Sequence, residues 1–269
     1  MREIKIKPKF KFTSITDTFD YNWDDGFIFT GESHIDIELV YVVSGCVQVG
    51  KDTKLYELTE GDMVIHGPME FHSIKSARKT SPHVYIIALM TEGDLPKNLT
   101  EGAFSLSSSE RSEFVALAKR IFSFFHGNEK DALTGQECVD ALSSLLIRIS
   151  LNHKAQPKII VSHSAMEYNK IASSMEDKVY DNCSLEEFAK LNNISVSNMK
   201  ILFKKHCGLS PKVYYRQLRC AEAIKLMTEG LSSAEAADKL NFSSPSYFNT
   251  FFKRMTGKTP QTFIKKFTL

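Results

Sequence analysis

The sequence has little cysteine, and its hydrophobic residues never form a long run. The five cysteines, at positions 46, 138, 183, 207 and 220, form no C-x-x-C pair, which argues against a disulfide framework or a zinc-thiolate site. The longest apolar segments, such as 86–90, are far shorter than the roughly 20 residues of a membrane span. Residues 1–5 lack the apolar stretch of a secretory signal. We therefore expect a cytoplasmic protein that binds no membrane.

What the chain does contain is an ordinary globular composition with an uneven distribution of charge. Its 269 residues, 42% hydrophobic and 25% charged, are enough for two domains. Residues 1–158 carry 18 basic and 22 acidic side chains, whereas residues 159–269 carry 16 and 10. The second part therefore has a net charge of +6, which favours a polyanionic partner but also fits a solvated surface.

The first half has the pattern of a small β-barrel or sandwich. Short segments rich in β-branched and aromatic residues recur between glycine turns, at 35–43, 47–49, 55–58, 63–66 and 84–90. Capping boxes at Ser107 and Thr134 then begin two helices, and the remainder shows helical periodicity. We predict an α+β protein of two domains: a barrel or sandwich with two helices over 1–153, a linker over 154–162 and an all-α domain over 163–269.

An internal repeat marks the second half. Segments 203–211 and 252–260 share the pattern F-K-[KR]-x-x-G-x-[ST]-P at an offset of 49 residues. A short capped helix and a tight turn precede each copy, which is the helix-turn-helix layout whose second helix enters a DNA major groove. We predict such motifs at about 184–207 and 233–256. A solenoid is the alternative for a duplicated hairpin, but a solenoid needs about three or more repeats.

The second helix of each copy divides into an anchoring face and an outer face. Met199, Leu202 and Phe203 are spaced to anchor the first copy, as are Phe248 and Phe252 in the second. Small polar residues near each helix start suit base edges, and basic residues one turn later suit phosphates. The predicted DNA-binding residues are Ser197, Lys200, Ile201, Lys204, Lys205, Ser246, Asn249, Thr250, Lys253 and Arg254.

Two further motifs accompany the repeat: Tyr214-x-x-x-Leu218-Arg219-x-x-x-Ala223 and Ser246-Tyr247-Phe248-x-x-x-Phe252-Lys253. Together these segments resemble the AraC/XylS family of bacterial transcription regulators over about residues 165–269. The resemblance implies a regulator and not an enzyme, with seven helices and a central helix over about 211–229 that holds two recognition helices one DNA turn apart. It places base contacts at Ser197, Lys200, Ile201, Ser246 and Thr250.

The chain departs from that family at two positions. Ile201 stands where the family often has a polar or charged residue, so it either contacts a thymine methyl or leaves the first helix with a small share of the recognition. Asn241 stands where a glycine is usual in the second turn, and asparagine tolerates the same left-handed backbone.

The first half resembles the cupin-like sensor domain of the same family, through Glu32-x-His34-x-x-x-Glu38 and a later His72. Residues 32, 34 and 38 would share one face of an extended strand. Enzymatic cupins hold a divalent metal with such a set, but Glu32 replaces their first histidine. We therefore expect no metal and no cofactor, with a metal cupin enzyme as the alternative. The predicted effector pocket consists of Trp23, Phe27, Phe29, His34, Glu38, Tyr41 and His72.

The helix expected at about 134–151 carries an apolar stripe that suits either intrachain packing or a homodimer, and the resemblance favours the dimer. The stripe consists of Cys138, Leu142, Leu145, Leu146 and Ile149. The expected partners are double-stranded DNA, an unidentified small-molecule effector, a second copy of the chain and RNA polymerase. A first domain that only dimerises or binds a partner protein is the alternative to a sensor.

Overall fold

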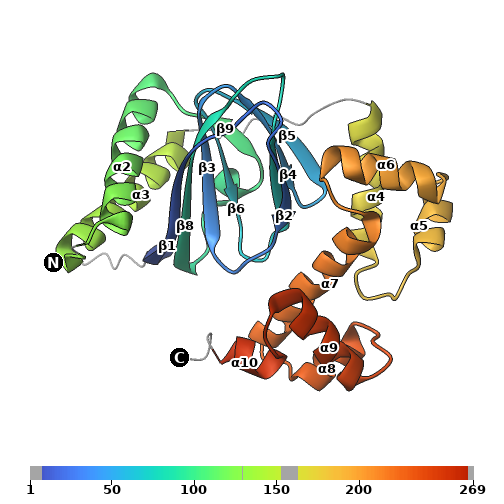
Figure 1. The fold of residues 1–269 in the computed structure, drawn as a ribbon. Coiled ribbons are helices and arrows are strands. Elements are labelled where there is room, and N and C mark those ends of the chain that lie inside the picture. The colour runs from blue at the N-terminus through green and yellow to red at the C-terminus, as the bar shows by residue number, and fades with distance from the viewer. Residues whose placement is uncertain (1–7, 129, 153–162, 266–269) are drawn as a thin grey trace.

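The computed structural model describes residues 8–128, 130–152 and 163–265. In these ranges a β-rich N-terminal domain is followed by an all-helical C-terminal domain (Figure 1). The predicted α+β architecture is confirmed, whereas the predicted linker, 154–162, lies outside the described residues. Among the helices described, none has both the length and the apolar character needed to cross a bilayer.

Two antiparallel sheets form the N-terminal domain. The five-stranded sheet has the order β1-β8-β3-β6-β9 and the four-stranded sheet the order β2-β7-β4-β5. The strands are β1 (Phe10–Asn22), β2 (Ile28–Glu32), β3 (Ile37–Ser44), β4 (Cys46–Lys51), β5 (Lys54–Thr59), β6 (Asp62–His66), β7 (His72–Ser76), β8 (His83–Gly93) and β9 (Ala103–Ser105). Their inner faces pack on each other as a sandwich whose two sheets are not joined, and this sandwich is referred to below as the barrel.

The five-stranded sheet is buried on both faces. On β3, Val40 and Val42 contact the apolar core between the sheets, while Leu39 and Tyr41 belong to the core formed with α2 (Ser108–His126) and α3 (Ala132–Asn152). These two helices cover the side of the barrel opposite the C-terminal domain (Figure 1). A sheet covered on both faces needs nearly continuous apolar strands, which is why β3, β6 and β8 stood out in the sequence.

Helix α3 corrects the prediction of the dimer stripe. Cys138, Leu142, Leu145, Leu146 and Ile149 are all 0% exposed and pack on α2 and the five-stranded sheet within the chain. Intrachain packing therefore accounts for the stripe, and these side chains offer no free surface to a second subunit. The helix also begins earlier than predicted, because the Asp131 carboxylate accepts the Thr134 N–H and caps it from upstream.

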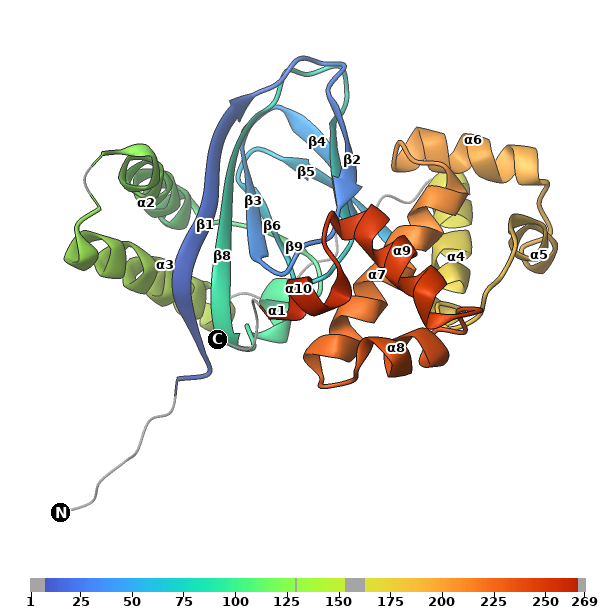
Figure 2. The same cartoon turned by 60° about the horizontal axis from the view of Figure 1, so that its bottom comes forward.

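Seven helices form the C-terminal domain in the described residues, as the resemblance implies. They are α4 (His163–Asp177), α5 (Leu185–Leu191), α6 (Val196–His206), α7 (Pro211–Thr228), α8 (Ser233–Lys239), α9 (Pro245–Thr256) and α10 (Pro260–Ile264), and a further short helix, α1 (Lys97–Thr100), lies in the first domain. The first half of α7 packs with α4–α6, and its second half packs with α8–α10. One continuous helix thus joins two small helical cores (Figure 2).

Candidate nucleic-acid interface and ligand site

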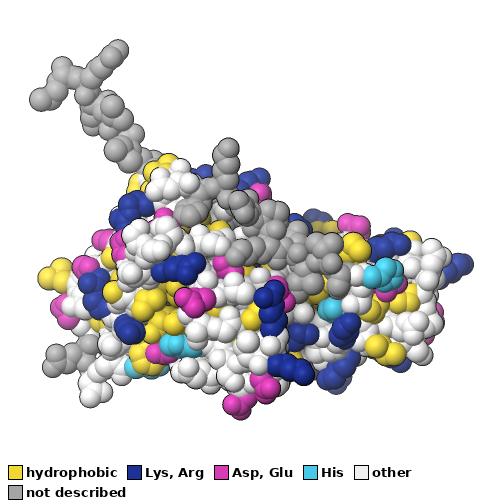
Figure 3. All heavy atoms as spheres, turned by 90° about the horizontal axis from the view of Figure 1, so that it is seen from above, with side chains coloured by type: hydrophobic (Ala, Val, Ile, Leu, Met, Phe, Trp, Pro, Cys, Tyr) yellow, Lys and Arg dark blue, Asp and Glu magenta, His cyan; other side chains and the backbone are white. Residues whose placement is uncertain are grey.

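The first helix-turn-helix unit consists of α5, a turn and α6. Met199, Leu202 and Phe203 are buried in its core, as their spacing predicts. Ile201 is 64% exposed, a large value for an apolar side chain, so its methyl groups are open to a partner. The predicted outer residues Ser197, Asn198, Lys200, Ile201, Lys204 and Lys205 are all exposed. Figure 3 shows Lys and Arg side chains on the right-hand side of the molecule, where α4–α6 lie.

The second unit, α8 with α9, repeats this arrangement. Phe248 and Phe252 are fully buried, and the neighbouring anchors Phe251 and Met255 are half-buried on the same core. The predicted outer residues Ser246, Asn249, Thr250, Lys253 and Arg254 are exposed. Tyr247, which its helical position also predicts to face outward, is 52% exposed beside them.

Both turns use asparagine where the backbone is left-handed. Asn193 has φ +54° in the first turn and Asn241 has φ +53° in the second. The expectation for Asn241 is therefore confirmed, since asparagine is one of the few residues that adopt this region readily. The two turns hold their second helices in equivalent ways, which supports the repeat.

Arg219 on α7 connects the two units. Its guanidinium donates to the Asn182 side chain at 2.9 Å, before α5, and to the carbonyl oxygen of Leu240, before the second turn. The same group lies 4.2 Å from the centre of the Phe242 ring. The side chain is 5% exposed, so this buried charge fixes the orientation of one unit relative to the other.

The C-terminal end of α6 is docked on the four-stranded sheet. Lys75 on β7 donates to the carbonyl oxygen of Lys205 at 2.6 Å, and Gln48 on β4 donates to that of His206 at 3.2 Å. Gly208 follows with φ +75°, and a Cβ there would lie 2.7 Å from a β2 side chain. The first recognition helix is therefore held by the barrel at one end, while its N-terminal end stays exposed.

Helix α7 is held by the turn between β4 and β5. The Tyr214 hydroxyl donates to the backbone oxygen of Asp52 at 3.0 Å, and its ring packs edge-on against Phe71 at 5.1 Å. Leu55 and Phe71 of the barrel belong to the same apolar core as α4–α7. This interface was missed by sequence analysis, because nothing in a strand pattern tells which later helix it will contact.

Asp52 gives this interface a pH dependence. Burial, followed by the charge of Glu70, raises the pKa of Asp52 from 3.8 to about 7, although its Oδ1 accepts a hydrogen bond from the Phe71 N–H. The unfolded carboxyl ionises near its ordinary pKa, so the folded state is expected to lose stability as the pH rises from about 4 to 7.

We predict that Asp52→Asn stabilises the protein more at pH 8 than at pH 5, because the amide carries no charge to desolvate. A pKa raised by about 3 units corresponds to at most about 4 kcal/mol. Thermal unfolding of wild type and variant at both pH values measures the difference, with exposed Asp94→Asn as the control. An equal change at both pH values contradicts the assignment.

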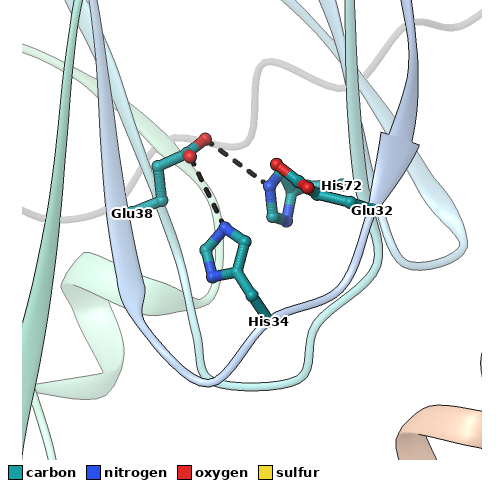
Figure 4. A group of neighbouring side chains, drawn as sticks. All are labelled: Glu32, His34, Glu38 and His72. Atoms are coloured by element: carbon teal, nitrogen blue, oxygen red, sulfur yellow. Dashed lines mark ion pairs between the residues drawn. The ribbon is translucent and has the colours of Figure 1, made fainter. Parts of the chain in front are cut away.

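A cluster of polar side chains begins at Glu32, the last residue of strand β2. Glu32, His34, Glu38 and His72 point toward one another (Figure 4), and one ligand atom from each lies within 4.8 Å of the others. The Glu38 oxygens lie 3.5 Å from His34 Nε2 and 3.6 Å from His72 Nε2. The His66 ring stacks on His72 at 4.5 Å, and its Nδ1 is 2.7 Å from Glu70 Oε1.

The electrostatics of this cluster keep Glu38 ionised. Burial opposes its charge, but the nearby imidazoles of His34, His72 and His66 lower the pKa of Glu38 overall. The pKa of His34 is raised, because the Glu38 carboxylate outweighs the effect of burial. Burial lowers the pKa of His66 well below its ordinary value. The cluster therefore combines anionic carboxylates with imidazole nitrogens.

A cavity of about 410 Å³ lies between this polar end and the C-terminal domain. Glu32 and His34 line it from the barrel, and Gln217 and Cys220 line it from α7. Buried polar atoms without a hydrogen-bond partner among the described residues include Ser33 Oγ, His34 Nδ1 and Gln217 Oε1. A partly open cavity with mainly apolar walls and a few unpaired donors and acceptors at its polar end is suited to a small ligand.

The structure does not bring the seven predicted pocket residues into one place. His34, Glu38 and His72 converge, whereas Trp23 and Phe27 stack on each other at 4.1 Å at the other end of β2. Phe29 is 36% exposed on β2. Tyr41 faces α2, with its ring 4.9 Å from that of Phe114. The prediction of a single pocket formed by all seven residues is therefore wrong. Only His34, Glu38 and His72 lie together, at the polar end of the barrel.

Comparison with known proteins agrees with the helix-turn-helix units of the second domain. Residues 188–266 match a family model described as a helix-turn-helix domain. The HTH-type transcriptional activator RhaR of Mannheimia succiniciproducens is 23% identical over 168 residues, which cover 53% of this chain and 61% of RhaR. The uncharacterized HTH-type transcriptional regulator YbfI of Bacillus subtilis is 25% identical over 220 residues, covering 77% and 78%. ToxT from Vibrio cholerae aligns with a TM-score of 0.39 at 14% identity, covering 96% of this chain and 98% of ToxT.

Fold and site together define a two-domain protein with an antiparallel β-sandwich and a helical domain that contains two helix-turn-helix units. The C-terminal part of the chain is an AraC-type helix-turn-helix domain, and its relatives are HTH-type transcriptional regulators. The resemblance seen in the sequence motifs is thereby confirmed. The alignment spans about three fifths of RhaR and about four fifths of YbfI.

Proposed function

We propose that this protein is a transcription regulator that binds double-stranded DNA through α6 and α9. The observation that carries the proposal is the repeated unit itself, in which Phe203 and Phe252 are buried while the faces beside them stay exposed. An exposed, partly basic helix face at the second position of a helix-turn-helix is the element that enters a major groove. The relatives, which are named as regulators, support the same function.

Within each recognition helix, the residues that suit base contacts and those that suit phosphate contacts lie at different positions along the helix. Ser197 and Ser246 lie in the first turn and Thr250 in the second, and they suit base edges, with Ile201 facing a thymine methyl. The basic side chains follow one turn later and suit phosphates. Lys204 and Lys205 also donate to Gly208 O at 3.2 Å and Ser164 Oγ at 2.9 Å, so they would exchange or share these bonds on DNA.

The roles within the helices predict different effects on binding. Lys204→Ala and Lys253→Ala should weaken binding about equally on all duplexes, because phosphates carry no sequence information. Ser246→Ala and Thr250→Ala should change the preference at one or two base pairs, by about 1–3 kcal/mol at most. A site selected from a random duplex library with wild type, then measured with each variant on matched and mismatched duplexes, separates the two effects. Altered preference in the lysine variants alone would show that our helix register is wrong.

We further propose that a small ligand at the polar end of the barrel controls this activity. The cavity there has walls from both domains, so a ligand in it contacts α7 directly. A ligand that binds the folded state raises the melting temperature. A first domain that only dimerises or binds a partner protein would show no such shift.

A homodimer and contact with RNA polymerase complete the proposal. A second subunit would present a second pair of recognition helices to paired half-sites, through a surface other than the buried stripe on α3. Sedimentation of the full chain with and without duplex measures the oligomeric state.

A further inference from the structure

The ligand at the polar end can be specified further, and this inference rests on the proposed function. We propose that Glu32, His34, Glu38 and His72 bind one divalent transition-metal ion, and that this ion couples the barrel to the C-terminal domain. The four side chains come from the end of β2, the segment that follows it, β3 and β7, and they converge on one point (Figure 4). This reverses the expectation from sequence, which rested on Glu32 replacing a histidine.

The tautomer of His72 is the first argument for a cation. Its Nδ1 lies 3.1 Å from the backbone oxygen of Glu70. A carbonyl oxygen only accepts, so Nδ1 carries the hydrogen and the neutral ring has its lone pair on Nε2. Nε2 is buried without a hydrogen-bond partner among the described residues and faces the Glu38 carboxylate. A lone pair that faces a carboxylate calls for a proton or a metal ion between them, and the 3.6 Å separation is too long for an N–H···O hydrogen bond. An N–H donated to a carbonyl is also the usual orientation of a metal-binding histidine.

The distances around Glu38 are the second argument. The separations of 3.5 Å to His34 Nε2 and 3.6 Å to His72 Nε2 exceed normal hydrogen bonds. Bonds of about 2.0–2.2 Å from one zinc ion in tetrahedral geometry place neighbouring ligand atoms about 3.4 Å apart. These two spacings are close to that of a metal site, and the four ligand atoms, which lie within 4.8 Å of one another, would draw together around an ion.

The donor types decide which metals suit the site. Two imidazole nitrogens with two carboxylate oxygens favour zinc, iron, manganese, cobalt or nickel, whereas magnesium and calcium prefer oxygen ligands alone. The carboxylates of Glu32 and Glu38 match the charge of a divalent ion when both histidines are neutral. Glu32 is exposed and His34 is partly exposed, so an ion reaches the site from the interdomain cavity.

The position of the site explains how an ion would affect the second domain. The segment between Glu32 and β3 lines the cavity opposite α7, α9 and α10. Gln217 Nε2 of α7 lies 3.5 Å from the carbonyl oxygen of Gly31, and Met69 packs on the core of α8–α10. The Met69 N–H donates to the carbonyl oxygen of His34 at 2.6 Å. Fixing His34 and Glu32 on a metal therefore fixes the barrel surface against which the second helix-turn-helix unit is docked.

Metal binding is tested on the full-length protein, stripped with a chelator and titrated with Zn²⁺ and with Co²⁺, whose visible absorption reports four-coordinate geometry. We expect one equivalent of either ion, a rise in melting temperature, and at least tenfold weaker binding for His34→Gln and for Glu32→Gln. His83→Gln is the matched control, because His83 pairs with Asp20 outside the cluster. No saturable binding, or binding that the two ligand variants leave unchanged, overturns the site.

The coupling is tested by measuring duplex affinity with the metal-loaded and the chelator-treated protein. We expect the two affinities to differ at least fivefold, and to become equal in His34→Gln. Equal affinities in wild type overturn the coupling and leave the DNA-binding proposal standing. Absence of DNA binding in both states would instead refute the proposed function, while the titration still decides the metal site.

Discussion

Phe203→Ala and Phe252→Ala are each expected to lower the free energy of unfolding by about 3–5 kcal/mol. Both phenylalanines are 0% exposed. Phe203 packs edge-on against Tyr168 and Tyr214, with ring centres 5.0 and 5.2 Å apart. Phe252 packs against Phe248 at 5.9 Å. Each alanine leaves a ring-sized cavity in a core that is too small to close around it.

The two substitutions should destabilise different parts of the protein. Phe203 shares its core with Leu55 and Phe71 of the barrel, so Phe203→Ala should also loosen the contact between the domains. Phe252 lies in the core of α8–α10, so its loss should leave the first unit folded. Thermal unfolding combined with hydrogen exchange of the two units distinguishes these effects.

Exposed neighbours on the same helices provide the controls. Ile201→Ala and Tyr247→Ala remove side chains that are 64% and 52% exposed, and should change stability by less than about 0.5 kcal/mol. An unchanged melting temperature with lost DNA binding for either phenylalanine variant would place that ring in the groove and contradict the assigned anchoring face.

The C-terminal domain could be predicted from sequence because its determinants are local. The capping boxes at Ser184 and Ser232 begin α5 and α8 as expected, and the serine-proline pairs begin α7 and α9. Each helix carries its anchors at i, i+3 and i+4, so the buried face follows from spacing alone. The repeat then supplied a second, independent copy of every signal.

The strands of the barrel were only partly predictable, because their determinants are not local. Strands buried on both faces, such as β3 and β8, were visible as apolar runs. β1, β2, β7 and β9 were missed. β2 is largely exposed, β1 buries few of its residues, and β9 has only three residues. Strand pairing joins segments far apart in the chain, and a pattern of period two does not identify the partner.

The side chains of the polar cluster lie together for a different reason than the one predicted. Sequence parity placed residues 32, 34 and 38 on one face of a single strand, but Glu32 ends β2 and Glu38 lies on β3. The chain turns between them, and the turn brings the side chains together. The same reasoning about faces failed for Tyr41 and could not choose between intrachain packing and a dimer for the stripe on α3, because a sequence does not tell which neighbour will cover an apolar face.

DNA binding by the full-length protein is expected to weaken about 500-fold between 50 and 200 mM salt. Five exposed basic side chains lie on the outer faces of the two recognition helices: Lys200, Lys204, Lys205, Lys253 and Arg254. Each phosphate neutralised contributes a slope of about −0.9 to the dependence of log affinity on log salt. Five contacts give a slope of about −4.5, measured by fluorescence anisotropy of a labelled duplex over a salt series.

The slope also measures how many phosphates the protein contacts, so the assignment of phosphate contacts to particular basic residues can be tested one residue at a time. Lys204→Gln combined with Lys253→Gln should reduce the slope by about 2, to near −2.7, because two counterions fewer are released. Lys97→Gln combined with Lys119→Gln removes the same charge from exposed sites on the N-terminal domain and should leave the slope unchanged. If both pairs reduce the slope equally, binding follows net charge alone, and α6 and α9 are not the elements that contact the phosphates. A wild-type protein that binds no duplex at 50 mM salt would remove the basis of the proposed function.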